Sequence, residues 1–136
     1  MVQMERAWHK SGVSRTIMEL VKIRVSELNR CAYCLDMHTK EARSEGETEQ
    51  RIYALPAWRE TPFFTQKERA ALAWAEALTH IAHSVPDALF DDLQQHFSDR
   101  EIAGLTAGIN AINAWNRWAI SLKAELPGTY RPDLAR

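Results

Sequence analysis

Apolar residues recur at intervals of three and four along most of this chain, which is the spacing of one face of an α-helix. In the first half this pattern is interrupted at Asn29-Arg30 and again near Gly46, a residue suited to the position after a helix C-terminus. Ser14 is a good N-cap for the first of these segments. The predicted early helices run from Ser14 to Leu28, from about Cys31 to Ser44 and from Thr48 to Leu55.

The second half begins with a predicted loop, because Pro56 to Thr65 contains two prolines. Two Ser/Thr-x-x-Glu sequences, Thr65 to Glu68 and Ser98 to Glu101, are capping boxes that predict helix starts. The helices expected here run from Thr65 through Ile81, from a first turn containing Pro86 through Phe97, and from Ser98 to about Glu125, with an irregular tail after Pro127.

No segment shows the strict alternation of apolar and polar residues that is typical of a strand. The pattern therefore predicts an all-α fold, a single-domain helical bundle of about six helices covering residues 1–136. A helical chain of this length often buries an apolar face against another copy of itself, so we expect a homo-oligomer formed through helix faces.

The composition of the chain limits which partners and which cellular compartment we expect. The 136 residues carry a formal net charge of −1, with 46% hydrophobic and 26% charged residues and no block of like charge. Such a chain has no basic field to attract nucleic acid or a membrane surface. Met1 to Gly12 lacks the apolar core of a secretory signal, so we expect a cytoplasmic protein, where cysteine pairs serve redox or metal chemistry more often than structure.

Both cysteines of the chain lie in one short run, Cys31-Ala-Tyr-Cys34, and His38 follows four residues after the second. Cys31 is expected at a helix N-terminus, where free backbone N–H groups favour a thiolate. The imidazole of His38 can reach the Cys34 sulfur at i+4 and activate it as a nucleophile. Glu19, on the preceding helix, could orient His38 if the two helices pack antiparallel, and Glu27 is the nearer alternative.

Other interpretations of these residues stay open at this point. Cys31, Cys34, His38 and Glu19 are ligand types that zinc accepts, although the usual second pair of distant ligands is lacking. Two cysteines can also simply be buried as small hydrophobic residues. On the last helix, Asn110, Asn113 and Asn116 recur at every third position; we expect a solvated or inter-subunit face, and the alternative is a buried hydrogen-bond network.

The stretch from Glu19 to His38 closely resembles the core motif of the alkylhydroperoxidase D-like (AhpD-like) proteins of the carboxymuconolactone decarboxylase superfamily. That motif is a glutamate, eleven intervening residues, and then C-x-x-C-x-x-x-H, and all four positions match here. The sequence Asn113-Ala-Trp-Asn-Arg117 is also similar to the family. One position departs, because the well-studied peroxidases of this family carry a second histidine between the cysteines, where this chain has Tyr33.

The resemblance implies an all-helical fold that assembles into trimers or hexamers and a thiol-dependent peroxidase or disulfide oxidoreductase with an antioxidant role. Cys31 and Cys34 would be the redox pair, and Glu19 and His38 the proton relay, with no cofactor and no metal. The partners would be a hydroperoxide or small disulfide as substrate and an external dithiol or lipoyl-type reductant. Tyr33 is a poor base at neutral pH, so one part of the peroxidase relay is missing.

Within this hypothesis we expect Cys34 to face the peroxide, because His38 stands nearest to it, and Cys31 to meet the reductant. The opposite assignment follows if the helix N-terminus makes Cys31 the better nucleophile. Two other functions are alternatives: a decarboxylase or lactone-processing enzyme of the wider superfamily that needs no cysteine pair, and a non-enzymatic thiol redox sensor.

Overall fold

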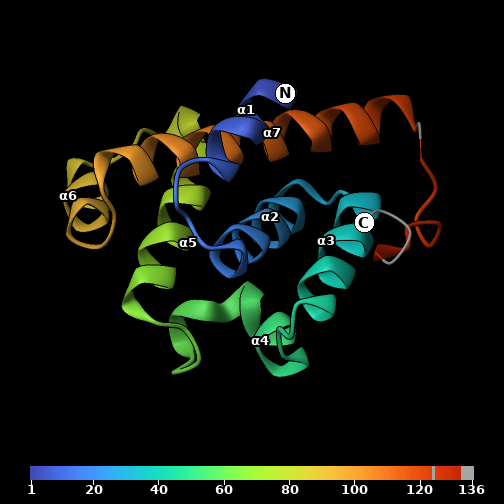
Figure 1. Ribbon diagram of the computed structural model, residues 1–136, viewed down its shortest axis with the longest axis horizontal. Coiled ribbons are helices and arrows are strands. Elements are labelled where there is room, and N and C mark those ends of the chain that lie inside the picture. The colour runs from blue at the N-terminus through green and yellow to red at the C-terminus, as the bar shows by residue number, and fades with distance from the viewer. Residues whose placement is uncertain (124, 133–136) are drawn as a thin grey trace.

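The computed structural model describes residues 1–123 and 125–132, and these form seven α-helices and no strand (Figure 1). The all-α prediction is therefore confirmed. The α-helices are α1 (Val2–His9), α2 (Arg15–Asn29), α3 (Ala32–Ser44), α4 (Glu49–Ala54), α5 (Gln66–Thr79), α6 (Asp87–His96) and α7 (Asp99–Leu122). Two 3₁₀ helices join them, η1 (Leu55–Glu60) and η2 (Ile81–His83).

Four helix starts have a side-chain cap, and three of these, at Ser14, Thr65 and Ser98, are predicted by the sequence. The side-chain oxygens of Ser14, Thr48, Thr65 and Ser98 each accept the backbone N–H three residues further on. At Thr65 and Ser98 the glutamate of the capping box also accepts the backbone N–H of the cap residue. These starts are local features, which explains why the sequence alone locates them.

The helix α1 was not among the roughly six helices expected. Met1 provides no side-chain cap, and Trp8 is the only residue of α1 that is fully buried, so the local signal is weak. The helix is held instead by its packing along α7, and the Trp8 side chain is 2% exposed. Tertiary contact rather than sequence propensity thus determines this element.

Several helix boundaries differ from the prediction by a few residues. The helix α5 ends at Thr79 rather than Ile81, and α7 ends at Leu122 because Lys123 adopts a left-handed conformation. Pro86 is the N-cap of α6 rather than a residue of its first turn. The first half of the segment expected as a loop, from Pro56 to Glu60, lies in η1, and residues 61–65 are irregular as predicted. Helix ends are the least certain part of any prediction from sequence.

The long helix α7 runs across one side of the molecule, and α2 lies beneath it with α3 and α5 on either side (Figure 1). Two glycines of α7 permit close packing. A Cβ at Gly104 would overlap the side chain of Ser11, and one at Gly108 would lie 2.7 Å from Cε of Met18. The buried apolar residues of α2, α5 and α7 form one core.

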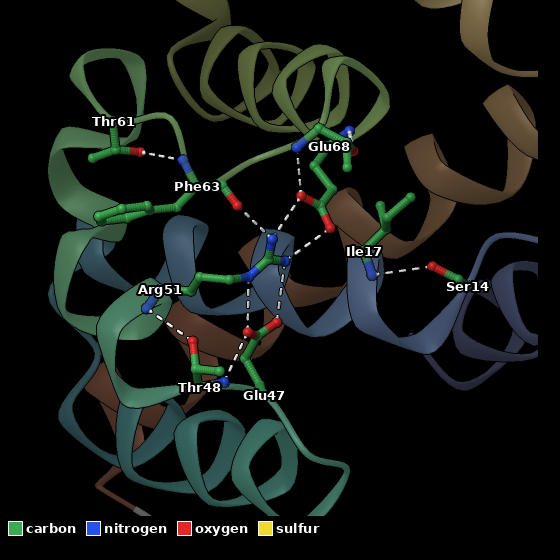
Figure 2. Close-up of polar contacts among 9 residues, drawn as sticks. Ser14, Ile17, Glu47, Thr48, Arg51, Thr61, Phe63 and Glu68 are labelled. Carbon is green, nitrogen blue, oxygen red and sulfur yellow. Dashed lines mark hydrogen bonds and ion pairs between the residues drawn. The ribbon is translucent and has the colours of Figure 1, made fainter.

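Arg51 fastens α4 to the start of α5 (Figure 2). Its guanidinium donates to both carboxylate oxygens of Glu47, to both of Glu68 and to the backbone carbonyl of Phe63. The distances lie between 2.7 and 3.3 Å. Since Glu68 also completes the capping box with Thr65, one buried carboxylate serves a helix start and an interhelical contact together.

Within the described ranges, no helix combines the length and the apolar character that a membrane span requires.

Candidate functional site

The cysteine pair lies at the junction of α2 and α3. Arg30 ends α2 in a left-handed conformation, and the backbone N–H of Cys31 then donates to the carbonyl of Ser26 at 3.0 Å. Cys31 is the N-cap of α3, and its sulfur accepts the backbone N–H of Cys34 at 3.4 Å. The Cα atoms of Cys31 and Cys34 are 5.4 Å apart, and a disulfide joins the two side chains.

His38 and Glu19 meet as the antiparallel packing of α2 and α3 would require. Nδ1 of His38 lies 2.9 Å from Oε2 of Glu19, and the two side chains are 8% and 6% exposed. Because the carboxylate engages Nδ1, Nε2 is the ring nitrogen left for a neighbouring sulfur or a substrate. Glu19 therefore orients the imidazole on the helix that carries both cysteines.

Glu27, the alternative carboxylate, is engaged elsewhere. It accepts from Arg24 at 3.0 Å, and Arg24 also donates to Glu76 on α5 at 2.9 Å. Burial raises the pKa of the Glu27 carboxyl, the Arg24 charge opposes that effect, and the Glu76 charge adds to it. Glu27 thus belongs to a contact between α2 and α5, and Glu19 is the carboxylate at the histidine.

The surroundings of Glu19 favour its charged form. Burial alone would raise the pKa of this carboxyl, but the hydrogen bond and charge of His38, together with the charges of Lys22 and Arg15, outweigh burial and lower it. Lys22 is itself buried, with its ammonium 3.2 Å from Glu5 and 4.8 Å from the centre of the Trp8 ring.

A cavity of about 470 Å³ opens beside Cys34 and His38. Its walls come from four helices and are mainly aromatic and apolar, with one buried cation. The lining residues are Glu5, Lys22, Tyr33, Cys34, Met37, His38, Trp115, Trp118, Ala119 and Glu125. This is the size range of cavities that bind small organic molecules. A ligand held here would contact the sulfur of Cys34 and the imidazole together.

Tyr33, between the two cysteines, is half-buried and lines this cavity. Burial raises the pKa of its phenol, and the charges of Glu125 and Asp36 raise it further. The phenol therefore stays protonated at neutral pH, where it can donate a hydrogen bond but cannot act as a base. The missing histidine of the family pattern is not replaced by another base at this position.

A buried amide network supports the end of α2. The amide of Asn29 donates to the side-chain oxygens of Asn113 and Asn116 at 2.9 Å each, and Asn116 donates to Ser26 at 3.1 Å. Asn116 is fully buried and Asn113 nearly so, whereas Asn110 is exposed. The expected solvated face is thus wrong for two of the three asparagines, because their partners on α2 are distant in sequence. The network fixes the segment that presents Cys31.

The sequence did not reveal Lys22, Glu5 or the aromatic wall of the cavity. Glu5 and Trp8 belong to the helix that was not predicted, and the tryptophans of the wall, Trp115 and Trp118, come from α7, which is distant in sequence from Cys34. Lys22 does carry a local signal, because it lies one turn after Glu19 and therefore on the same face of α2.

No three His, Cys, Asp or Glu side chains gather into a metal-binding arrangement anywhere in residues 1–123 and 125–132.

A bundle of helices with a C-x-x-C pair and a carboxylate-bound histidine at one cavity defines a class of all-α proteins. The chain belongs to the carboxymuconolactone decarboxylase family, whose model matches residues 2–77. Within it the chain is AhpD-like, as its similarity to solved structures shows.

Three relatives illustrate that placement. The Bacillus subtilis protein YdfG is 46% identical over 90% of this chain and 84% of its own length. A structure from Agrobacterium tumefaciens, described as a candidate antioxidant defence protein AhpD, is 43% identical with a TM-score of 0.86, covering 93% of this chain and 87% of that chain. The structure of a peroxidase-related protein from Silicibacter sp. TM1040 is 26% identical with a TM-score of 0.80, covering 94% of this chain and 68% of that chain.

Proposed function

We propose that this protein is a thiol-dependent peroxidase, or a closely related disulfide oxidoreductase, that works through Cys31 and Cys34. The observation that carries the proposal is the cavity in which the sulfur of Cys34 and the imidazole of His38 lie together, with Glu19 on the far ring nitrogen. The similarity to a candidate antioxidant defence protein supports the same chemistry.

In the reduced protein, His38 takes the proton of the Cys34 thiol, and Glu19 stabilises the imidazolium that forms. The thiolate attacks one oxygen of a hydroperoxide, the O–O bond breaks, and the leaving alkoxide takes the proton from His38. Cys34 is now a sulfenic acid, and the thiolate of Cys31 attacks its sulfur, forming the disulfide and releasing hydroxide, which a proton converts to water. An external dithiol then reduces the disulfide by exchange.

The test is peroxide consumption with a dithiol donor by the wild type, Cys34→Ser and Cys31→Ser. Loss of Cys34 should abolish the reaction, and loss of Cys31 should leave a sulfenic acid on Cys34 that a sulfenate-selective reagent traps. The reverse pattern would assign the peroxide to Cys31. Wild-type activity in both variants would rule the mechanism out.

The two alternatives give different results. Activity on a lactone substrate that persists after both cysteines are replaced by serine would indicate a non-redox enzyme of the family. Negligible turnover, together with a change in oligomer size on reduction of the disulfide, would indicate a redox sensor.

A further inference from the structure

The two cysteines of the disulfide line different cavities. Cys34 lines the large cavity beside His38, whereas Cys31 lines a second cavity of about 280 Å³. Tyr33, Ala119 and Glu125 line both, so they form the wall between the two spaces. A thiolate that reduces a disulfide attacks one sulfur while the other leaves with the electron pair. The second cavity therefore gives access to Cys31 without passing the peroxide site.

The chemistry of this second cavity is distinctive. Its remaining walls combine apolar side chains, among them Ile120, Leu126 and Pro127, with the cations Arg30 and Lys123. Neither cation has an ion-pair partner among the residues that the structure describes. Among the lining residues that the structure describes, Glu125 alone is acidic, so two positive charges face one negative charge there.

Both cations occupy backbone positions that ordinarily favour glycine. Arg30 ends α2 with φ 56° and Lys123 ends α7 with φ 51°, each in the left-handed region. This conformation is unfavourable for any residue with a Cβ, and glycine is the usual residue at such helix ends. Folding by itself would favour glycine at both positions, yet the chain places a long cation at each, beside the same cavity.

We propose, resting on the thiol chemistry assigned above, that this cavity binds small thiols that carry a carboxylate, and that Arg30 and Lys123 hold that carboxylate. The small thiol loses its proton to solvent and attacks Sγ of Cys31 as a thiolate. The Cys31–Cys34 bond breaks, and Cys34 leaves as a thiolate that takes up one proton from solvent. A second thiol then attacks the mixed disulfide, releasing the oxidised thiol and Cys31. Two thiols are oxidised and one protein disulfide is reduced.

The burial of Cys31 beneath an exposed rim favours a slender ligand. The Cys31 side chain is 1% exposed, so a reductant must reach into the cavity rather than meet the sulfur at the surface. A volume of about 280 Å³ suits a slender thiol with one acidic group.

The experiment measures how fast three thiols of different charge reduce the disulfide: 3-mercaptopropionate, 2-mercaptoethanol and cysteamine. Rates are compared at equal thiolate concentration, with free protein thiols counted by alkylation and mass spectrometry. For the wild type we expect the anionic thiol to react roughly fivefold to tenfold faster than the neutral one, with the advantage falling as salt rises. The cationic thiol should be slowest.

The variants Arg30→Gly and Lys123→Gly, singly and combined, test the two cations without endangering the fold, because glycine adopts the left-handed conformation freely. In the double variant the ratio of anionic to neutral rates should fall to about one. Arg30→Lys keeps the positive charge, so its ratio of anionic to neutral rates should stay close to that of the wild type. The matched control is Lys10→Gly, which removes an exposed cation at the C-cap of α1, near the opposite end of α7.

Equal rates for all three thiols in the wild type, or an unchanged ratio in the double variant, would overturn the proposal. So would a second copy of the chain covering this cavity in solution, seen as protection of Arg30 and Lys123 from chemical modification in the oligomer. Peroxide consumption by the wild type is measured separately. Its absence would reject the proposed peroxidase while leaving the charge preference of Cys31 measurable.

Discussion

At the scale of single residues, the site depends on the hydrogen bond between Glu19 and His38, which fixes the orientation of the histidine that would act as a base. Glu19 engages Nδ1 of His38 at 2.9 Å, with both side chains buried, so the imidazole has one orientation. Sequence spacing alone leaves both Glu19 and Glu27 open, and the family resemblance favours Glu19. The structure places Glu19 at His38 and shows that Glu27 is bound to Arg24.

Replacing the carboxylate should therefore slow the thiol chemistry. Glu19→Gln keeps the shape but removes the charge that stabilises the imidazolium, and we expect the rate of Cys34 with a hydroperoxide to fall about 100-fold. Stopped-flow measurement on reduced protein would show this. The matched control, Glu27→Gln, should stay within about twofold of the wild type, and an equal loss in both variants would remove the special role of Glu19.

The same carboxylate links stability to pH. The folded protein lowers the pKa of Glu19 below its ordinary 4.5, so the stabilisation is fully present above that value and is lost as the pH falls through the folded pKa. Urea unfolding between pH 6 and pH 3 measures the free energy of unfolding at each pH. This free energy should fall less steeply with decreasing pH for Glu19→Gln than for the wild type. The depressed carboxyls of Asp36, Glu76 and Glu101 are common to both proteins, so the difference isolates Glu19. An identical pH dependence of the free energy of unfolding in the wild type and Glu19→Gln would contradict this role of Glu19.

At the scale of elements, the helices were predictable where their ends are encoded locally. The capping residues Thr65 and Ser98 locate the starts of α5 and α7, and the break at Asn29-Arg30 puts Cys31 at the start of α3. The helix α1 and the amide network of Asn29, Asn113 and Asn116 were not predictable, because both depend on contacts with α7 that are remote in sequence.

At the contact between α1 and α7, helix propensity and packing predict opposite changes in the free energy of unfolding for the same substitution. Alanine in place of Gly104 should stabilise a free helix by about 1 kcal/mol. In this fold its Cβ would overlap Ser11, whose hydroxyl is held between the carbonyl of Trp8 and the N–H of Val13. We therefore expect Gly104→Ala to lower the free energy of unfolding by about 1–3 kcal/mol.

Chemical denaturation measures the effect of Gly104→Ala. The exposed neighbour Ala103 provides the control, since Ala103→Gly should lose only the propensity difference of about 1 kcal/mol. A stabilised Gly104→Ala protein would show that α1 does not pack against α7 as described.

At the scale of the whole molecule, the core is large enough that the disulfide is not needed to hold it. The buried apolar cluster draws on α1 through α7, and the bridge closes a separation of only three residues. Self-association remains a prediction at this scale. The described residues expose apolar side chains that include Tyr53, Trp118 and Leu126, and light scattering would measure the oligomer.

Reduction of the bridge should accordingly leave the protein folded. A loop this short contributes about 2 kcal/mol in the chain-entropy description, so adding a dithiol should lower the free energy of unfolding by no more than about that amount. Circular dichroism with and without reductant, and on a protein with both cysteines replaced by serine, measures the helix content. Loss of helix on reduction would make the disulfide a structural bridge and weaken the redox proposal.

The sequence by itself determined the all-α class, most helix starts, the C-x-x-C pair at the N-terminus of a helix, and the family to which the motif points. These follow from local rules of periodicity, capping and spacing. The tertiary structure decided the rest: that Glu19 rather than Glu27 meets His38, that an unpredicted helix brings Glu5 and Trp8 to Lys22, and that Cys31 and Cys34 line separate cavities. Each depends on packing between segments distant in sequence, which spacing along one chain does not encode.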